Sequence, residues 1–114
     1  MLVIVDAENV RRSTWPNVPA GRLVELLDAW AAANDAEVLA VFDGRAPAGA
    51  ARVDAIGTAS ESADDWITRR VGDLDQPYVL VTSDRELRAR AGARAAKIVG
   101  GGSFLRELMR PTAP

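Results

Sequence analysis

Three aspartates, Asp6, Asp43 and Asp84, each stand at or just after the end of a short apolar segment, and the adjacent Asp64 and Asp65 follow a fourth candidate strand. Two carboxylates about 4 Å apart repel each other by roughly 4 kcal/mol at an effective dielectric constant near 20. Several acids that converge on one place therefore need a cation, or some of them must stay protonated. A divalent metal ion meets this requirement most simply.

The residue types that are missing narrow the chemistry further. The chain of 114 residues has no cysteine and no histidine. This excludes disulfide scaffolds, thiolate and imidazole metal sites, and nucleophiles activated by histidine. Oxygen ligands alone suit Mg²⁺ or Mn²⁺ rather than zinc. One or two such ions can position a water, lower its pKa and neutralise charge on a phosphate, which is the metal-assisted route to phosphodiester hydrolysis.

The segments that must position these acids alternate between strand and helix patterns. Short apolar runs predict strands at residues 2–5, 38–42 and 78–81, and residues 52–56 and 96–99, which also contain charged residues, are the fourth and fifth strand candidates. Apolar residues at helical spacing predict helices at residues 23–31, 63–71, 85–91 and 104–109. We therefore expect an α/β fold, a three-layer α/β/α domain with a central, mainly parallel sheet of about four to five strands.

In an open parallel sheet, ligands bind outside the carboxyl ends of the strands, because the loops that carry side chains into a shared crevice lie there. We expect all five aspartates at this edge. Glu8 and Asn9 follow Asp6 in its loop, and Glu61 comes one turn before Asp64. The sequence thus predicts an unusually acidic site.

Each acid also has a structural explanation. Ser62 with Asp65, and Ser83 with Glu86, have the spacing of capping boxes at helix starts. Asp84 is equally suited to cap the helix that follows it. Taken singly, these residues are explained as well by structure as by function.

Two further residues have structural alternatives of the same kind. Asp43 precedes Gly44 in an ordinary turn dipeptide, and Asn9 is able to bond the backbone of its own loop. The grouping of the acids on one edge is what favours a functional site.

Basic and aromatic residues near these acids suggest a groove for a nucleic-acid backbone, although a solvated protein face explains them equally well. Trp15 lies on no helical face, so it is available to stack a base or to close the pocket. Trp30 and Trp66 fit the core better. The candidate backbone-binding residues are Arg11, Arg12, Arg69, Arg70, Arg85 and Arg88.

Four motifs follow one another along the chain: VIVDAENV at residues 3–10, VFDG at 41–44, SADDWI at 62–67 and VTSDREL at 81–87. In order and spacing they resemble the NYN branch of the PIN-like nuclease superfamily, nearest to its YacP-like members. The resemblance spans nearly the whole chain. It implies a PIN-like fold and a Mg²⁺- or Mn²⁺-dependent ribonuclease, in most members an endonuclease on single-stranded or structured RNA.

The resemblance also implies a role for individual residues. Asp6 would be the central metal ligand, with Asn9 beside it. Asp64 would be a second ligand with Asp65 as its neighbour, and Asp84 would be a third. Supporting positions at the edge of the site would belong to Asp43, Thr82 and Ser83.

The length fits one compact domain, so we expect residues 1–114 to form a single PIN-like (NYN) domain. The apolar run at residues 2–5 is too short for a signal sequence or a membrane span, which predicts a cytoplasmic protein that does not bind membranes. The expected partner is RNA. A homodimer would supply RNA-holding elements that longer relatives carry themselves, and no sequence feature supports an antitoxin-like or ribosome-associated partner.

The leading hypothesis is therefore an endoribonuclease in which Asp6, Asp64 and Asp84 hold Mg²⁺ or Mn²⁺. One alternative is a catalytically inactive PIN-like module that binds RNA or a protein partner. The other is a phosphotransfer domain with Asp6 or Asp43 as its nucleophile. A dehalogenase-like phosphatase requires an aspartate two positions after the nucleophile, and after Asp6 that place holds a glutamate. A receiver domain requires a lysine at the end of the last strand, whereas the single lysine comes early in it.

Overall fold

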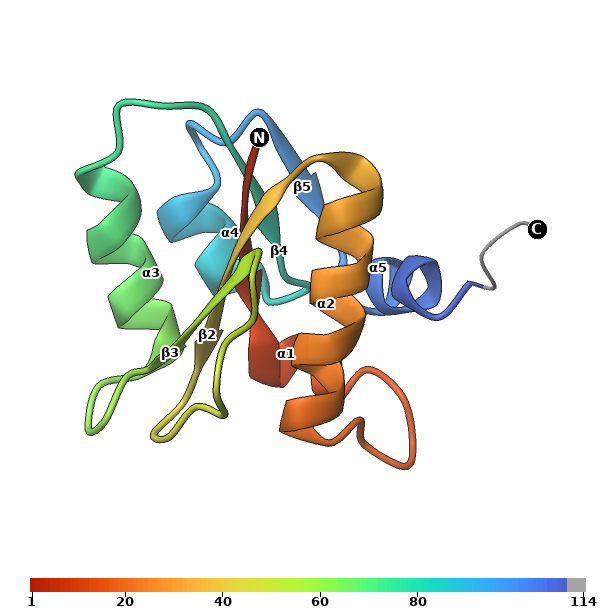
Figure 1. The fold of residues 1–114 in the computed structure, drawn as a ribbon. Coiled ribbons are helices and arrows are strands. Elements are labelled where there is room, and N and C mark those ends of the chain that lie inside the picture. Colours follow the sequence, from red (N-terminus) through yellow and green to blue (C-terminus); the bar gives the residue numbers. More distant parts are fainter. Residues whose placement is uncertain (111–114) are drawn as a thin grey trace.

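The structure is a computed structural model and describes residues 1–110 (Figure 1). It contains a five-stranded sheet in the order β3-β2-β1-β4-β5, and every neighbouring pair of strands is parallel. The strands are β1 (Leu2–Asp6), β2 (Glu37–Phe42), β3 (Val53–Gly57), β4 (Tyr78–Val81) and β5 (Lys97–Val99). The helices are α1 (Ala7–Arg11), α2 (Ala20–Asn34), α3 (Ala63–Gly72), α4 (Arg85–Ala91) and α5 (Gly101–Leu108).

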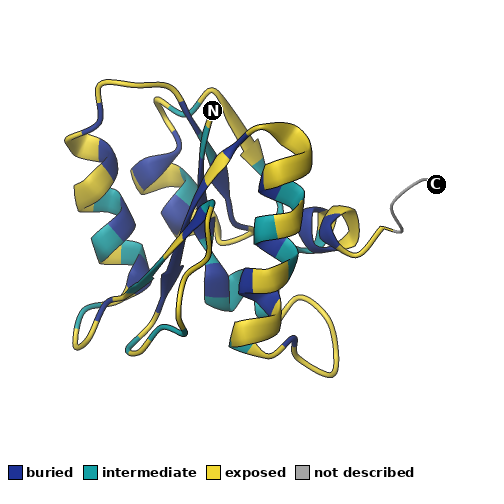
Figure 2. Ribbon diagram, in the orientation of Figure 1, coloured by how far each residue is buried: buried dark blue, intermediate teal, exposed yellow. Residues whose placement is uncertain are grey.

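Helices cover both faces of the sheet, with α1, α2 and α5 on one side and α3 and α4 on the other (Figure 1). The central strand β1 shows why. Val3 and Val5 pack into the core on the first face, whereas Ile4 packs into the core on the second. Because successive side chains of a strand point to opposite faces, a wholly apolar strand needs cover on both sides. Figure 2 shows the resulting band of buried residues along the sheet. The predicted three-layer α/β/α architecture is confirmed.

The order of the strands creates a switch point next to β1. The chain runs from β1 outward to β2 and β3, and it then returns to β4 on the other side of β1. The connections that leave the carboxyl ends of β1 and β4 therefore diverge to opposite sides. Open parallel sheets bind ligands in the crevice that such a divergence leaves.

The short helix α1 differs from the sequence-based expectation. The apolar pattern predicts a loop at residues 7–9, but Ala7–Arg11 form a helix directly after Asp6. Only Ala7 and Val10 are buried in it. A single turn with two buried residues is too short to display a helical period, which explains why the pattern does not reveal it.

The connection between β2 and β3 contains no helix. Parallel strands are usually joined by a helical crossover, whereas residues 43–52 run as an irregular segment with one isolated bridge between Ala50 and Val53. Gly44 adopts a left-handed φ of 73° at the start of this segment, which glycine tolerates best. No helix within residues 1–110 has the length and apolar character required to cross a membrane.

Candidate nuclease site at the carboxyl edge of the sheet

The carboxyl ends of β1, β2 and β4 surround an open pocket of about 390 Å³ at the lower edge of the sheet in Figure 1. Three of the predicted aspartates line it, and each comes from the end of a different strand. The loop residues between them are mainly polar. The lining residues are Asp6, Glu8, Asn9, Arg12, Ser13, Asp43, Ser83 and Asp84.

Asp6 lies at the end of the central strand and is the most buried of these acids. The hydroxyl of the fully buried Thr82 donates a hydrogen bond to Asp6 Oδ2 over 2.9 Å. The pKa of Asp6 is raised to about 6, and burial is the largest cause of this rise. The negative charges of Asp43, Asp64 and Asp84 add to the rise, and the hydrogen bond from Thr82 opposes it. Asp6 therefore sits in a negative field from three other carboxylates.

Asp84 is held at the start of α4 by its role as a helix cap. Its Oδ1 accepts a hydrogen bond from the backbone N–H of Leu87 over 3.0 Å. Its own backbone N–H donates to the hydroxyl of Thr82 over 3.1 Å. The Thr82 hydroxyl thus donates to Asp6 and accepts from Asp84, so a single side chain fixes both acids. The structural and functional explanations of Asp84 are compatible.

Asp43 reaches the pocket from the end of β2. Its Oδ1 accepts a hydrogen bond from the backbone N–H of Ala63, the first residue of α3, over 2.7 Å. A carboxylate is stabilised at a helix N-terminus by the unpaired N–H groups there. This contact ties the end of β2 to α3 and keeps Asp43 at the rim.

Asp64 stands close to the pocket without forming part of its wall. Its Oδ2 lies 3.4 Å from Arg90 on α4, while its Oδ1 is buried and has no hydrogen-bond partner among the described residues. Burial raises the pKa of Asp64, and the charge of Asp84 raises it further, whereas Arg90 lowers it.

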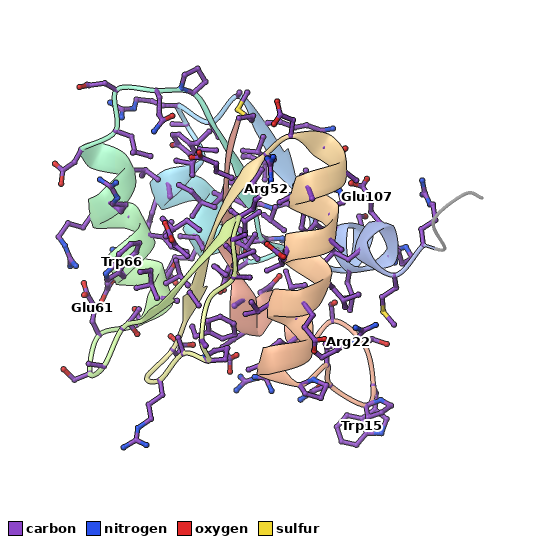
Figure 3. The ribbon with its side chains drawn as sticks, in the orientation of Figure 1. Trp15, Arg22, Arg52, Glu61, Trp66 and Glu107 are labelled. Atoms are coloured by element: carbon purple, nitrogen blue, oxygen red, sulfur yellow. The ribbon has the colours of Figure 1, made fainter. Side chains whose placement is uncertain are left out.

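Asp65 is not brought into the pocket. It is exposed and pairs with Arg90 over 2.8 Å, and this hydrogen bond lowers its pKa. Its backbone N–H donates a hydrogen bond to Ser62 Oγ. Ser62 thus caps α3, as the capping-box spacing predicted. Glu61 also faces away from the pocket, because it pairs with Arg69 on α3 (Figure 3).

Asn9 and Ser83, which line the pocket, are linked to Gly101 by hydrogen bonds. Asn9 Oδ1 accepts the backbone N–H of Ser83 over 2.9 Å, and Ser83 Oγ accepts the backbone N–H of Gly101 over 2.8 Å. A Cβ on Gly101 would overlap with Asn9 Oδ1, so any other residue here would displace the Asn9 side chain. This arrangement joins α1, the β4–α4 connection and α5.

Two expectations about local hydrogen bonds are wrong. Asn9 bonds Ser83 instead of its own segment. The predicted capping box of Ser83 with Glu86 does not form, because α4 begins one residue later and Asp84 is its cap. The hydroxyl of Ser83 instead accepts the backbone N–H of Gly101, the first residue of α5.

The predicted basic residues differ in how free they are to bind a phosphate. Arg11 binds Glu8 through two hydrogen bonds of 2.6 and 2.9 Å and donates from Nε to the carbonyl of Val18, so its charge is already neutralised. Arg12 lines the pocket, is 65% exposed and lies 3.4 Å from Glu8. Arg85 is exposed at the start of α4 but does not line the pocket.

The three tryptophans separate as the sequence predicted. Trp15 is 87% exposed at the tip of the segment between α1 and α2, at the lower right of Figure 3. Trp30 is half-buried and packs edge-on against Phe104 at 5.0 Å. Trp66 is half-buried against the core on the other face. Of the three, Trp15 alone is exposed.

Sequence reasoning missed two residues near the site. Ser13 lines the pocket, and Arg90 holds Asp64 and Asp65. Arg90 lies 26 positions from Asp64 and on another helix, so no spacing in the sequence links the two. Ser13 carries no pattern that distinguishes it from any other loop serine.

The residues of the site fit a hard divalent cation in their chemistry. The available side-chain donors are carboxylate, amide and hydroxyl oxygens, which Mg²⁺ and Mn²⁺ prefer. The raised pKa of Asp6 and the unpartnered Oδ1 of Asp64 both indicate carboxylates that lack a compensating positive charge. Within residues 1–110, however, no three acidic side chains stand close enough together to share one ion.

Comparisons with known proteins agree with the fold. Residues 20–113 match the model of the YacP-like NYN domain. The crystal structure of Rae1 (YacP) from Bacillus subtilis superposes with a TM-score of 0.71 at 21% sequence identity, over 95% of this chain and 73% of Rae1. Its W164L mutant gives a TM-score of 0.73 at 22% identity, over 94% of this chain and 74% of that one. No curated protein sequence matches the chain.

Proposed function

Because the chain belongs to the YacP-like NYN domain family, a family of nuclease type, we propose that it is a divalent-metal-dependent endoribonuclease that cleaves single-stranded or structured RNA. The observation that carries this proposal is Asp6. It ends the central strand at the switch point of the sheet, and burial together with three other carboxylates raises its pKa to about 6. Such an accumulation of negative charge is costly unless a cation binds there.

The proposed ligands of this cation are Asp6, Asp64 and Asp84, with Asp43 at the rim. Asp6 and Asp84 line the same pocket, and Asp64 contributes to the negative field at Asp6. A bound Mg²⁺ or Mn²⁺ would supply positive charge against the phosphate and would acidify water beside it. Asp65 pairs with Arg90, which also pairs with Asp64. Asp65 would therefore help to hold Asp64 in place through Arg90 and would not bind the metal ion itself.

The other residues of the pocket orient these acids and the substrate. Thr82 fixes Asp6 and the backbone of Asp84 through one hydroxyl. Asn9 fixes the connection after β4 by accepting the N–H of Ser83. The exposed guanidinium of Arg12 lies on the wall of the pocket, where it would bind a phosphate of the RNA backbone.

The direct test is cleavage of a labelled, unstructured RNA and of the same sequence as DNA, in Mn²⁺ and in EDTA. We expect Mn²⁺-dependent cleavage that the Asp6→Asn variant loses. Asp75→Asn is the matched control, because Asp75 is an exposed acid in the connection before β4, at the opposite end of the sheet. Cleavage by folded Asp6→Asn at the parent rate would refute the assignment, and comparison of RNA with DNA gives the sugar preference.

One observation favours a second candidate, a catalytically inactive module that binds RNA. No three carboxylates of the described residues gather closely enough to chelate an ion without rearrangement. Binding of RNA in EDTA with no product in Mn²⁺ would support this module over the nuclease. The phosphotransfer alternative gains nothing from the structure, since Lys97 lies at the start of β5 and does not line the pocket.

A further inference from the structure

A second groove continues from the acidic pocket along α5. We propose that this groove binds a nucleotide next to the cleaved bond of a single-stranded RNA, and that Arg106 and Arg110 hold its backbone phosphates. This inference rests on the proposed function, because it takes the acidic pocket as the place of cleavage. It adds a defined path for the strand on one side of that place.

The groove is a continuation of the pocket and has a suitable size. It encloses about 580 Å³ between α5 and the segment that follows α1. Ser13 lines both the pocket and the groove, so the two hollows share a wall. Sites for small ligands typically enclose about 300 to 1,000 Å³. The groove therefore has room for one nucleotide of a strand that passes Ser13.

The charges of the two hollows are opposite. Aspartates and one glutamate dominate the wall of the pocket, whereas no acidic residue lines the groove among residues 1–110. Arg106 and Arg110 line the groove, both are exposed, and neither forms an ion pair with a described acid. The acidic pocket repels RNA unless a cation is bound in it. Basic side chains next to the pocket are therefore needed to attract the RNA backbone. The two arginines provide that charge where the next phosphates would lie.

The acid on this helix is directed elsewhere. Glu107 accepts a hydrogen bond of 2.6 Å from the indole nitrogen of Trp30, on the side of α5 that faces α2 (Figure 3). Residues one position apart on a helix do not share a face. The carboxylate of Glu107 therefore does not cancel the charge of Arg106 in the groove.

The groove also offers surface for a base. Met109 lines it and is 59% exposed, and the buried Leu105 contributes to its floor. Thr14 lines the opposite wall, and the exposed Trp15 follows it directly. Positive charge beside apolar and aromatic surface is the combination by which proteins hold single-stranded nucleic acids.

Gly102 keeps the groove open between its two walls. A Cβ added to Gly102 would lie 3.7 Å from Arg106 Nη1 and 3.8 Å from Ser13 Cβ, which are ordinary contacts. An alanine therefore fits without displacing either neighbour. A leucine at the same place would project its branched side chain into the space between the walls, so Gly102→Leu blocks the groove and Gly102→Ala is its control.

The test is binding of a fluorescein-labelled, unstructured 12-nucleotide RNA to the full chain, measured by anisotropy in EDTA at several salt concentrations. The Arg106→Ala/Arg110→Ala variant should bind about tenfold more weakly, and the slope of log affinity against log salt should fall by about 0.7 for each phosphate that the variant no longer binds. The control Arg52→Ala/Lys97→Ala removes the same charge at the amino ends of β3 and β5, on the edge of the sheet away from the pocket. It should change the affinity less than about twofold, since general electrostatic attraction is screened within about a Debye length. Gly102→Leu should weaken binding, and Gly102→Ala should not.

Equal weakening by both double variants would overturn the groove, because only net charge would then matter. Failure of the parent to bind the RNA would overturn it as well. If an acidic peptide displaced the labelled RNA as efficiently as unlabelled RNA does, the groove would instead bind a protein partner, and the proposal would be wrong. If the parent cleaves RNA in Mn²⁺ and the groove variants bind and cleave as it does, the groove fails and the nuclease stands. If no RNA is cleaved but binding depends on the groove, the nuclease fails and the groove stands.

Discussion

The hydroxyl of Thr82 donates to Asp6 Oδ2 over 2.9 Å and joins the ends of β1 and β4 at the switch point of the sheet. The same hydroxyl oxygen accepts the backbone N–H of Asp84 over 3.1 Å. A hydroxyl has one hydrogen to donate and lone pairs to accept with, so Thr82 uses both capacities. The side chain of Asp6 and the backbone of Asp84 consequently depend on one buried side chain.

Replacement of Thr82 by valine keeps the shape of the side chain but removes the hydroxyl. Asp6 then loses its hydrogen bond, the N–H of Asp84 loses its acceptor, and we expect a loss of about 1 to 3 kcal/mol in the free energy of unfolding. The pKa of Asp6 should rise further, because the Thr82 hydrogen bond lowers it in the parent. Urea denaturation measures the first effect and carboxyl NMR titration the second. Thr82→Ser retains the hydroxyl and should keep the pKa of Asp6 at the parent value; a rise of that pKa equal to the one in the valine variant would contradict this account.

Asp6→Asn should stabilise the metal-free protein at neutral pH. The pKa of Asp6 is raised from 3.8 to about 6 on folding, so the folded state holds this proton more tightly than the unfolded state. The Asp6 contribution therefore lowers stability as pH rises from about 4 to about 6, and the full penalty persists above pH 6. At about 1.4 kcal/mol per pKa unit, the penalty is at most about 3 kcal/mol.

Urea denaturation of the parent and of Asp6→Asn in EDTA, from pH 4 to pH 8, measures this difference. The advantage of the variant should be largest at pH 8 and should diminish below pH 5. If the difference in unfolding free energy does not vary with pH, or if the variant is less stable than the parent at pH 8, the pKa of Asp6 is not raised on folding. Excess Mg²⁺ or Mn²⁺ should stabilise the parent more than the variant, because binding to the folded state alone raises stability.

Gly101→Ala should damage the site from outside the pocket. Its Cβ would overlap with Asn9 Oδ1, which must then leave the N–H of Ser83. Loss of this hydrogen bond together with steric overlap should cost about 1 to 3 kcal/mol of stability. Thermal and urea unfolding measure this cost, and cleavage or RNA binding reports the displaced connection after β4.

Gly72→Ala is the matched control for that substitution. Gly72 is the last residue of α3, and nothing lies within 4 Å of the Cβ it would gain. Alanine should be neutral or slightly stabilising there, because it loses less conformational freedom on folding than glycine. Equal destabilisation by both variants would mean that the contact between Gly101 and Asn9 does not matter.

Trp15→Ala should leave stability nearly unchanged and weaken RNA binding. The side chain is 87% exposed, so its removal forfeits little packing. Stacking of one base on an aromatic ring contributes about 1 to 3 kcal/mol to the binding of single strands. Trp15→Phe retains a stacking surface and should recover part of the affinity in an anisotropy titration. An alanine variant that binds RNA like the parent would remove Trp15 from the RNA path.

Much of the fold could be predicted because local patterns report burial. Wholly apolar runs predicted β1, β2 and β4, and residues 52–56 and 96–99 were the candidates for β3 and β5. The last residues of all five segments lie within one position of the observed strand ends. Helical spacing of apolar residues predicted α2, α3, α4 and α5. It failed for α1, whose two buried residues, Ala7 and Val10, are too few to define a period.

The sequence by itself determined which residue types are available and at which edge they gather. Because histidine and cysteine are absent, the side-chain ligands for a metal ion are limited to oxygen donors. Because the strands are parallel, Asp6, Asp43 and Asp84 lie at the same edge of the sheet. These conclusions hold because composition and strand direction do not depend on the details of packing.

Only the tertiary structure decided what each acid contacts. Arg90 reaches Asp64 and Asp65 from another helix, Thr82 bridges Asp6 and Asp84, and no local spacing encodes these pairs. Burial of Asp6 likewise depends on how β1 is enclosed by its neighbours, and burial is the largest cause of its raised pKa. Hydrogen bonds and desolvation act over a few ångströms in space, so the distances that govern them are fixed by packing between elements and not by separation along the chain.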